Sequence, residues 1–159
     1  MQSNSWRQSL AEYLPRLGHR NWIVIADSAY PDQVAGGIET LIAQDDHLSV
    51  VAEVLRAVDA AAHVRATVLI DNELDALDDA DAPGCAALRA GFSALFAGRE
   101  TRSLPHEEII RELDAAGSTF RILVIKTPLT LPYTTVFVRL ECGYWNADAE
   151  QRLQARLQS

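Results

Sequence analysis

Apolar positions along the chain follow two periods, one typical of helices and one typical of strands. Apolar residues three and four positions apart predict helices at 5–17, 47–62, 85–97, 106–117 and from 147 onward. Pro15 lies inside the first of these patterns, so we expect its last turn to be irregular. Gly18 and Gly117 follow or close helical patterns, as glycines at helix ends do.

Continuous apolar runs predict strands that are covered on both faces of a sheet. Such runs occupy residues 22–26 (WIVIA), 64–70 (VRATVLI), 120–126 (FRILVIK) and 134–141 (TTVFVRLE), and a shorter extended segment is expected near 38–43. The last two runs are expected to pair across TPLTLPY, as a rigid hairpin would.

Helices that alternate with buried strands predict an α/β fold with a largely parallel sheet flanked by helices. We expect residues 1–159 to form a single domain, with a C-terminal helical extension at about 143–159. The order of the strands does not follow from the sequence.

Charge and composition narrow the function classes. The chain has 159 residues, 48% of them hydrophobic, and a formal net charge of -8. Nucleic acids and anionic membrane surfaces bind clustered Lys and Arg, so neither is an expected partner. No apolar run approaches the roughly 20 residues of a membrane span, and the first residues lack the order of a secretory signal. Cys85 and Cys142 suggest no disulfide framework, and we therefore expect a cytoplasmic protein.

Motifs for metals and nucleotides do not occur. The chain has no HExxH or CxxC pairing and no GxGxxG or P-loop sequence. The carboxylates of the stretch DNELDALDDADAPG (71–84) are expected to form a solvated surface, since no His or Cys accompanies them. His47 and His63 flank a predicted helix and are expected at the surface. We therefore expect neither a metal nor a cofactor.

The segment RLGHRNWIVIADSAYP (16–31) raises a question about His19 and Asp27. They stand at opposite ends of one short predicted strand. Either both are ordinary turn residues, or the strand is a spacer between two groups that work together. Ligands of open α/β sheets bind beyond the carboxyl ends of the strands, where Asp27 lies. His19 would reach the same pocket only through a loop that folds back or from a neighbouring subunit.

Two further segments carry candidate residues. His106 follows Pro105 at the start of a predicted helix and is either part of a cap region or part of a site. In IKTPLTLPYTTVFV (125–138), Pro132 fixes the approach to Tyr133. Its hydroxyl then either points into a pocket or the ring merely packs.

Taken together, these segments resemble the D-ribose pyranase and L-fucose mutarotase (RbsD/FucU) family. The family shows a helix ending in Leu-Gly-His or Met-Gly-His, an apolar strand, then Asp-Ala and a proline, as in residues 16–31 here. PHEEI (105–109) resembles the ribose branch, and VIKTPLTLPYTTVFV (124–138) lies where the family has a turn with a Tyr before its last strand. In order, the likeness spans about residues 10 to 142.

The resemblance implies an RbsD-like fold and an isomerase that interconverts ring forms or anomers of a monosaccharide without a cofactor. It also implies ring-shaped homo-oligomers with active sites between subunits. His19 would be the catalytic histidine and Asp27 its partner. The substrate-binding residues implied by position are His106, Lys126, Tyr133 and Thr135.

The chain departs from the family at two functional positions. Pro128-Leu129 stands where the family has Gly-Glu, and Thr135 stands where it has Asn. These changes motivate a different hypothesis, a non-catalytic sugar-binding or regulatory module on the same fold. A third hypothesis is a metal-dependent enzyme that uses His19, Asp27 and His106.

Overall fold

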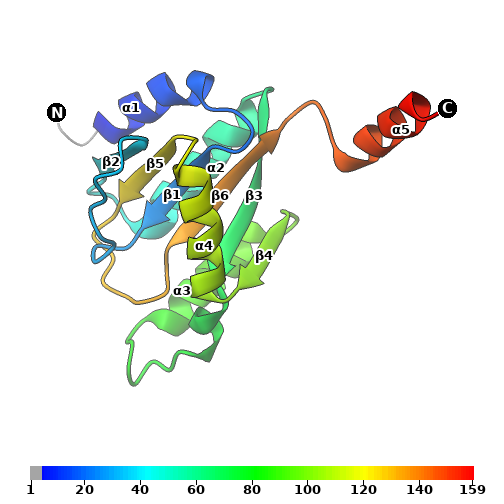
Figure 1. Cartoon of the computed structure of the whole chain (residues 1–159). Coiled ribbons are helices and arrows are strands. Elements are labelled where there is room, and N and C mark those ends of the chain that lie inside the picture. Colours follow the sequence, from blue (N-terminus) through cyan, green and yellow to red (C-terminus); the bar gives the residue numbers. More distant parts are fainter. Residues whose placement is uncertain (1–4) are drawn as a thin grey trace.

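Six strands form the sheet, in the order β2-β5-β1-β6-β3-β4 (Figure 1). The computed structural model describes residues 5–159. Its strands are β1 (Trp22–Ala26), β2 (Ile38–Ile42), β3 (Val64–Asp71), β4 (Thr101–Leu104), β5 (Ile122–Lys126) and β6 (Val136–Cys142). All neighbouring pairs are parallel except those of β6, which pairs antiparallel with β1 and β3. Five strands therefore share one direction, and the predicted α/β fold with a largely parallel sheet is confirmed.

The helices lie close to the predicted ranges. They are α1 (Ser5–Tyr13), α2 (His47–Ala60), α3 (Cys85–Phe96), α4 (His106–Gly117) and α5 (Ala147–Leu157), with short 3-10 turns η2 (Leu14–Arg16) and η3 (Asn72–Ala76). The turn η2 contains Pro15, which confirms the irregular end expected for the first helix.

The core has two layers, one on each face of the sheet. On one face, α1, α2 and α3 cover side chains such as Ile23 and Ile25 of β1. On the other face, α4 packs on Trp22 and Val24 of the same strand. Successive side chains of a strand point to opposite faces, so the run WIVIA serves both layers. Figure 1 shows α4 crossing the face opposite to α2.

Two details of the sheet differ from the sequence prediction. Strand β4 was not predicted, because TRSL is mostly polar and lies at the edge of the sheet. The strands β5 and β6 do not pair, because β1 lies between them. The segment 127–135 is therefore not a hairpin. It crosses the end of β1, where the Ser28 backbone N–H donates to the Leu129 carbonyl oxygen at 2.8 Å.

The C-terminal helix α5 extends away from the sheet and its covering helices (Figure 1). None of its residues is buried. The chain leaves β6 through Gly143, where an added Cβ would lie 2.5 Å from the Ala62 carbonyl oxygen, so only glycine fits. Within residues 5–159 no helix has the length and apolar character needed to cross a membrane.

Candidate functional site

Polar residues gather where the carboxyl ends of the parallel strands meet. Asp27 follows β1, Asp71 ends β3, His106 follows β4 and Thr127 follows β5. Because β6 runs in the opposite direction, Thr135, which precedes it, reaches the same edge of the sheet. This is the edge at which open α/β sheets bind their ligands.

A cavity of about 480 Å³ opens at this edge, beside α4 and the loops that follow β1 and precede β6. Its volume is that of an ordinary small-molecule site. The lining includes Asp27, Asp71, His106, Tyr133 and Thr135. The structure thus brings Asp27, His106, Tyr133 and Thr135, four of the predicted site residues, to one cavity.

His106 and Asp71 form a hydrogen-bonded pair in the wall of this cavity. Nδ1 of His106 lies 3.0 Å from each carboxylate oxygen of Asp71. The Asp71 side chain is 1% exposed and that of His106 is 31% exposed. Since an ionised carboxylate only accepts, Nδ1 carries the proton, and Nε2 is left without a hydrogen bond in residues 5–159. A carboxylate in this position fixes the tautomer and stabilises the imidazolium.

Burial raises the pKa of Asp71 to about 6, although its hydrogen bond to His106 acts in the opposite direction. The negative charges of Glu73 and Asp27 raise this pKa further. Glu73 also accepts a hydrogen bond from the His106 backbone N–H at 3.0 Å, which ties the start of α4 to the turn after β3. The Asp71 carboxyl therefore changes its charge at about pH 6, and His106 is held both by Asp71 and by Glu73.

Asp27 is oriented by Thr135. The Thr135 hydroxyl donates to Oδ1 of Asp27 at 2.8 Å. The two residues are 108 positions apart in sequence and meet because the segment 127–135 crosses the end of β1. A carboxylate whose one oxygen is held in this way can still accept a hydrogen bond at its other oxygen.

Tyr133 stands beside the histidine. Its φ of 59° lies in the left-handed region, which residues other than glycine seldom adopt. The Tyr133 ring meets the His106 ring edge-on, at 82° and 5.8 Å between centroids. The side chain is part of the cavity wall and is also 41% exposed.

Asp71 was missed as a site residue, and its predicted environment was wrong. It is the first residue of the acidic stretch 71–84, which was expected to be solvated, yet it is 2% exposed. It is buried because it is still part of β3, a strand inside the sheet. The missed signal is an acid directly after an apolar run, as at Asp27.

His19 lies at the opposite end of β1 from this cavity. It is exposed in the turn after Gly18 and lines a separate hollow with Trp22 and Arg139. A strand rises by about 3.3 Å per residue, so the five residues of β1 hold His19 roughly 17 Å from Asp27. Within one chain the structure does not bring the two predicted catalytic residues together.

Lys126 is the last residue of β5, paired with Ala26 and Ile42 of the flanking strands. Alternation places it on the face of the sheet that α4 covers, together with Val124. It is not part of the cavity lining, so its predicted contact with a sugar has no counterpart within this chain.

His47 is buried, not at the surface as predicted. It is 2% exposed, its Nε2 donates to the Thr134 carbonyl oxygen at 2.8 Å, and its Nδ1 lies 2.7 Å from the Thr127 hydroxyl. Burial lowers its pKa, although the hydrogen bond to Thr134 acts in the opposite direction. His47 therefore supports the β5–β6 segment as a neutral side chain. His63 is half-buried and donates to Leu14 and Leu17 carbonyl oxygens.

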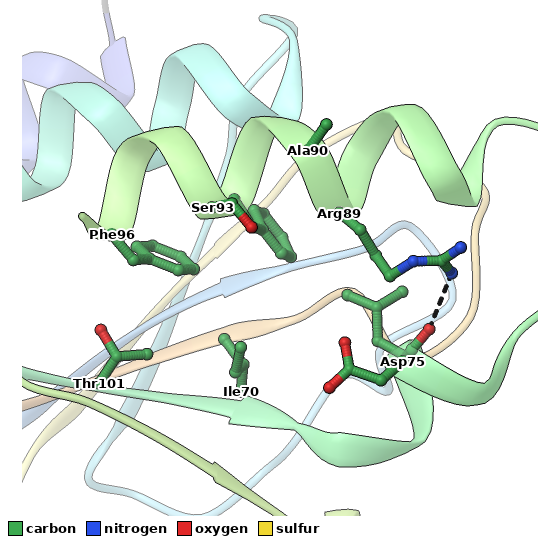
Figure 2. A pocket seen from close by; sticks show the side chains of 9 residues that line it. Ile70, Asp75, Arg89, Ala90, Ser93, Phe96 and Thr101 are labelled. Carbon is green, nitrogen blue, oxygen red and sulfur yellow. Dashed lines mark hydrogen bonds between the residues drawn. The ribbon is translucent and has the colours of Figure 1, made fainter.

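Figure 2 shows a second hollow of about 420 Å³, between α3 and the strands β3 and β4. Arg89 reaches across one end, and its guanidinium donates to the carbonyl oxygens of Leu74 and Leu77 at 3.0 Å each. This arginine holds the turn η3, which carries Glu73 toward His106. The guanidinium of Arg89 therefore stabilises the turn η3.

The fold and the cavity define the class of protein to which the chain is similar: an α/β protein with a polar pocket at the carboxyl ends of its strands and a histidine-carboxylate pair inside it. Among residues 5–159 no three His, Cys, Asp or Glu side chains are arranged to hold a metal ion. No protein-family model and no curated protein sequence matches the chain.

Solved structures do match it. RbsD of Bacillus subtilis, complexed with D-ribose, is 25% identical with a TM-score of 0.58, and the match covers 87% of this chain and 93% of that one. The fucose mutarotase of Streptococcus pneumoniae, in complex with L-fucose, is 14% identical with a TM-score of 0.57 over 84% and 91% of the two chains. FucU of Bifidobacterium longum is 13% identical with a TM-score of 0.52 over 84% and 94%. The resemblance to the RbsD/FucU family is thus confirmed, and it is a divergent one.

Proposed function

We propose that the protein is a cofactor-free sugar mutarotase or pyranase, which interconverts ring forms or anomers of an aldose. The observation that carries this proposal is the His106–Asp71 pair, which faces a cavity large enough for a small molecule. The similarity to structures that hold D-ribose and L-fucose supports a sugar as the ligand. A cytoplasmic location and a ring-shaped homo-oligomer are parts of the same proposal.

The reaction needs a base and an acid. The base removes the proton of the anomeric hydroxyl while the acid protonates the ring oxygen, and the bond between the anomeric carbon and the ring oxygen breaks to give the open aldehyde. The open aldehyde then rotates about the adjacent C–C bond, and the reverse proton transfers close the ring in the other form. Nε2 of His106 has the free lone pair for the base, and Asp71 stabilises the imidazolium that forms. A positioned acid or base contributes about 10²–10⁴-fold in rate.

The second proton-transfer group in this proposal is His19 of a neighbouring copy. His19 is exposed, as a residue that completes a site on another subunit must be. Asp27 and Tyr133 would hold the sugar hydroxyls, with Thr135 fixing the orientation of Asp27. Lys126 keeps its predicted role only if a second copy brings the sugar within its reach.

A second candidate function is a non-catalytic sugar-binding module. The observation that favours it is Leu129, whose side chain packs against the core layer beneath α1, α2 and α3. Leu129 supplies no carboxylate where the family has Glu. Thr135 supplies a hydroxyl in place of the family's amide. Such a module would keep the pocket and bind a sugar without accelerating its ring opening.

Exchange spectroscopy by NMR tests the proposal. Aldoses labelled at the anomeric carbon, D-ribose and L-fucose among them, are mixed with the protein, and exchange between their ring forms is measured with and without a chelator. We expect catalysed exchange that the chelator leaves unchanged. Binding without faster exchange would favour the module, and exchange abolished by the chelator would favour the metal-dependent enzyme.

A pair of histidine variants makes the test specific. His106→Gln should lower the exchange rate by at least about tenfold. His63→Gln is the control, because His63 lies outside the cavity and an amide can still donate to the carbonyl oxygens it contacts. Equal rates in both variants would contradict the role of His106.

A further inference from the structure

The cavity that contains His106 has acidic side chains and neither Lys nor Arg among its lining residues. The acids are Asp27, Asp71, Glu107 and Asp114. Asp71 is engaged by His106, and Asp27 accepts a hydrogen bond from a threonine. Glu107 and Asp114 have neither a side-chain hydrogen bond nor an ion pair within residues 5–159. Two of the four carboxylates are therefore free to meet a ligand.

Helix α4 sets the direction of these two free carboxylates. Glu107, Ile110 and Asp114 follow the three- and four-residue spacing of one helix face, and all three line the cavity. Glu108, in the same first turn, is exposed and is not part of the lining. The carboxylates of α4 that add negative charge to the cavity are therefore those on this one face of the helix.

Tyr30 supplies an independent observation. It is 8% exposed and lines the cavity, and its buried hydroxyl has no hydrogen-bond partner within residues 5–159. Burial, with the negative charges of Asp114, Asp27 and Asp71, raises the pKa of Tyr30 to about 12. A buried hydroxyl without a partner is unfavourable until a ligand supplies one. A ligand with polar hydrogens would give the Tyr30 oxygen a donor and would suit the negative charge of the pocket.

We propose that this cavity selects its sugar by charge, and that it binds an aldose carrying a protonated amine in preference to the corresponding neutral aldose. An ammonium group offers three donors. Glu107 and Asp114 lie seven residues apart on α4, about 10 Å along its axis, so one ammonium group contacts one of the two carboxylates. Asp114 is the charge that acts most strongly on Tyr30, so Asp114 and the Tyr30 hydroxyl oxygen are the matching acceptors, and Glu107 adds attraction at longer range. A phosphate or carboxylate on the sugar would meet like charges and binds less tightly.

The strength of this preference follows from exposure. Glu107 and Asp114 are both exposed, so each contributes what a surface ion pair contributes, and salt screens it. One such pair gives up to about a fivefold preference at low ionic strength. This inference rests on the proposed function only in taking the cavity as the sugar site, and it concerns binding rather than rate.

Calorimetric titration of the full-length protein tests the preference. The probes are D-glucosamine and D-galactosamine, each compared with its parent aldose, with its N-acetyl derivative and with the 6-phosphate of the parent. At about pH 6.5 and low salt, where the amine is protonated, at least one amine should bind about fivefold more tightly than its parent. The preference should disappear at about pH 9 and in high salt, and the 6-phosphates should bind more weakly than their parent aldoses.

Matched variants locate the effect. Glu107→Gln and Asp114→Asn should each lower the ratio of the affinity for the amine to the affinity for the parent aldose, whereas Glu108→Gln should leave this ratio unchanged. Equal affinity of amine and parent in both pairs would overturn the inference. If a neutral aldose then still showed catalysed ring exchange, the mutarotase proposal would stand without it.

Discussion

His19 and Asp27 stand at opposite ends of the five-residue strand β1, on opposite edges of the same sheet. One chain therefore cannot place both residues in one binding site. If both act in catalysis, the site is completed by a neighbouring copy, as in a symmetric oligomer whose contacts repeat. Whether His19 and Asp27 work together can therefore be tested by mixing subunits of two variants.

Two inactive variants should restore activity when their subunits are mixed. We expect His19→Ala and Asp27→Asn each to slow ring exchange by at least about tenfold, since each removes one side of the shared site. Random assembly of equal amounts gives about a quarter of the sites both residues. Exchange spectroscopy on co-expressed variants should therefore show about a quarter of the wild-type rate.

The fold of both variants should remain intact. His19 is exposed in a turn and Asp27 lies at a cavity, so each substitution is expected to change the free energy of unfolding by less than about 1 kcal/mol. A folded His19→Ala protein with an undiminished exchange rate would remove His19 from the mechanism. A slow His19→Ala protein that no mixture rescues would argue against a site shared between copies.

The buried carboxylate behind His106 predicts a change in the pH profile. Replacing Asp71 by Asn keeps an acceptor for Nδ1 but removes the charge that stabilises the imidazolium, so exchange should slow by at least about tenfold. The wild-type rate should rise as Asp71 ionises through its pKa of about 6. Rates measured from pH 5 to 8 should lack this rise in Asp71→Asn.

Stability separates this role of Asp71 from a merely structural one. Its pKa in the folded state, about 6, lies above the ordinary 3.8, so its contribution to the free energy of unfolding is full below pH 3.8 and is lost as the pH rises through about 6. Asp71→Asn should lack this loss and be at least as stable as the wild type at pH 8. A variant that is both inactive and strongly destabilised at pH 8 would point to a structural role.

His47 predicts the opposite dependence on pH. Its pKa is lowered by burial, so the unfolded chain binds a proton more readily than the folded one. Neutral His47 therefore makes its full contribution to the free energy of unfolding above about pH 6.5, and this contribution decreases as the pH falls below that value. Urea unfolding at several pH values should show the fall in the wild type and its absence in His47→Leu.

The same variant should be less stable at pH 7.5 by about 1–3 kcal/mol, since the buried carbonyl oxygen of Thr134 loses its donor. His63→Gln, which retains a donor, serves as the comparison. An unchanged stability of His47→Leu at pH 7.5 would show that the hydrogen bonds from His47 to the segment 127–135 do not stabilise the protein.

Much of the fold was predictable because the apolar periods are strong. The run WIVIA is buried at every position, and the helices α2 and α4 lie within two residues of their predicted ends. Pairing was not predictable in the same way. The hairpin expected across residues 127–133 was wrong because β1 occupies the place between β5 and β6, and contacts so distant in sequence leave no local pattern.

The residues at the cavity were also predictable only in part. Asp27 was predicted to lie where ligands bind because it follows a strand. The same rule applied to Asp71 would have predicted its place at the cavity. Its pairing with His106 depends on β4, a short polar edge strand that no apolar period marks. The burial of His47 likewise depends on the segment that crosses the end of β1.

The assembly is the last prediction. We expect a homo-oligomer larger than a dimer, with Tyr133 at or near a contact between copies. Tyr133 is 41% exposed at the cavity, and Val34, which follows the lining residue Gln33 in the chain, is 97% exposed. Apolar side chains at the mouth of a site are usual where a neighbour covers it. Light scattering at micromolar concentration should therefore give a mass above that of two chains.

A pair of tyrosine variants ties this mass to the cavity. Tyr133→Glu places a charge in the expected contact and should lower the assembled mass together with the exchange rate, because the neighbour that carries His19 is lost. Tyr144→Glu introduces the same charge at a residue that is 78% exposed outside the cavity, and should change neither. A wild-type protein that is only monomeric at this concentration would exclude a site shared between copies, and His106 with Asp71 would then have to act without His19.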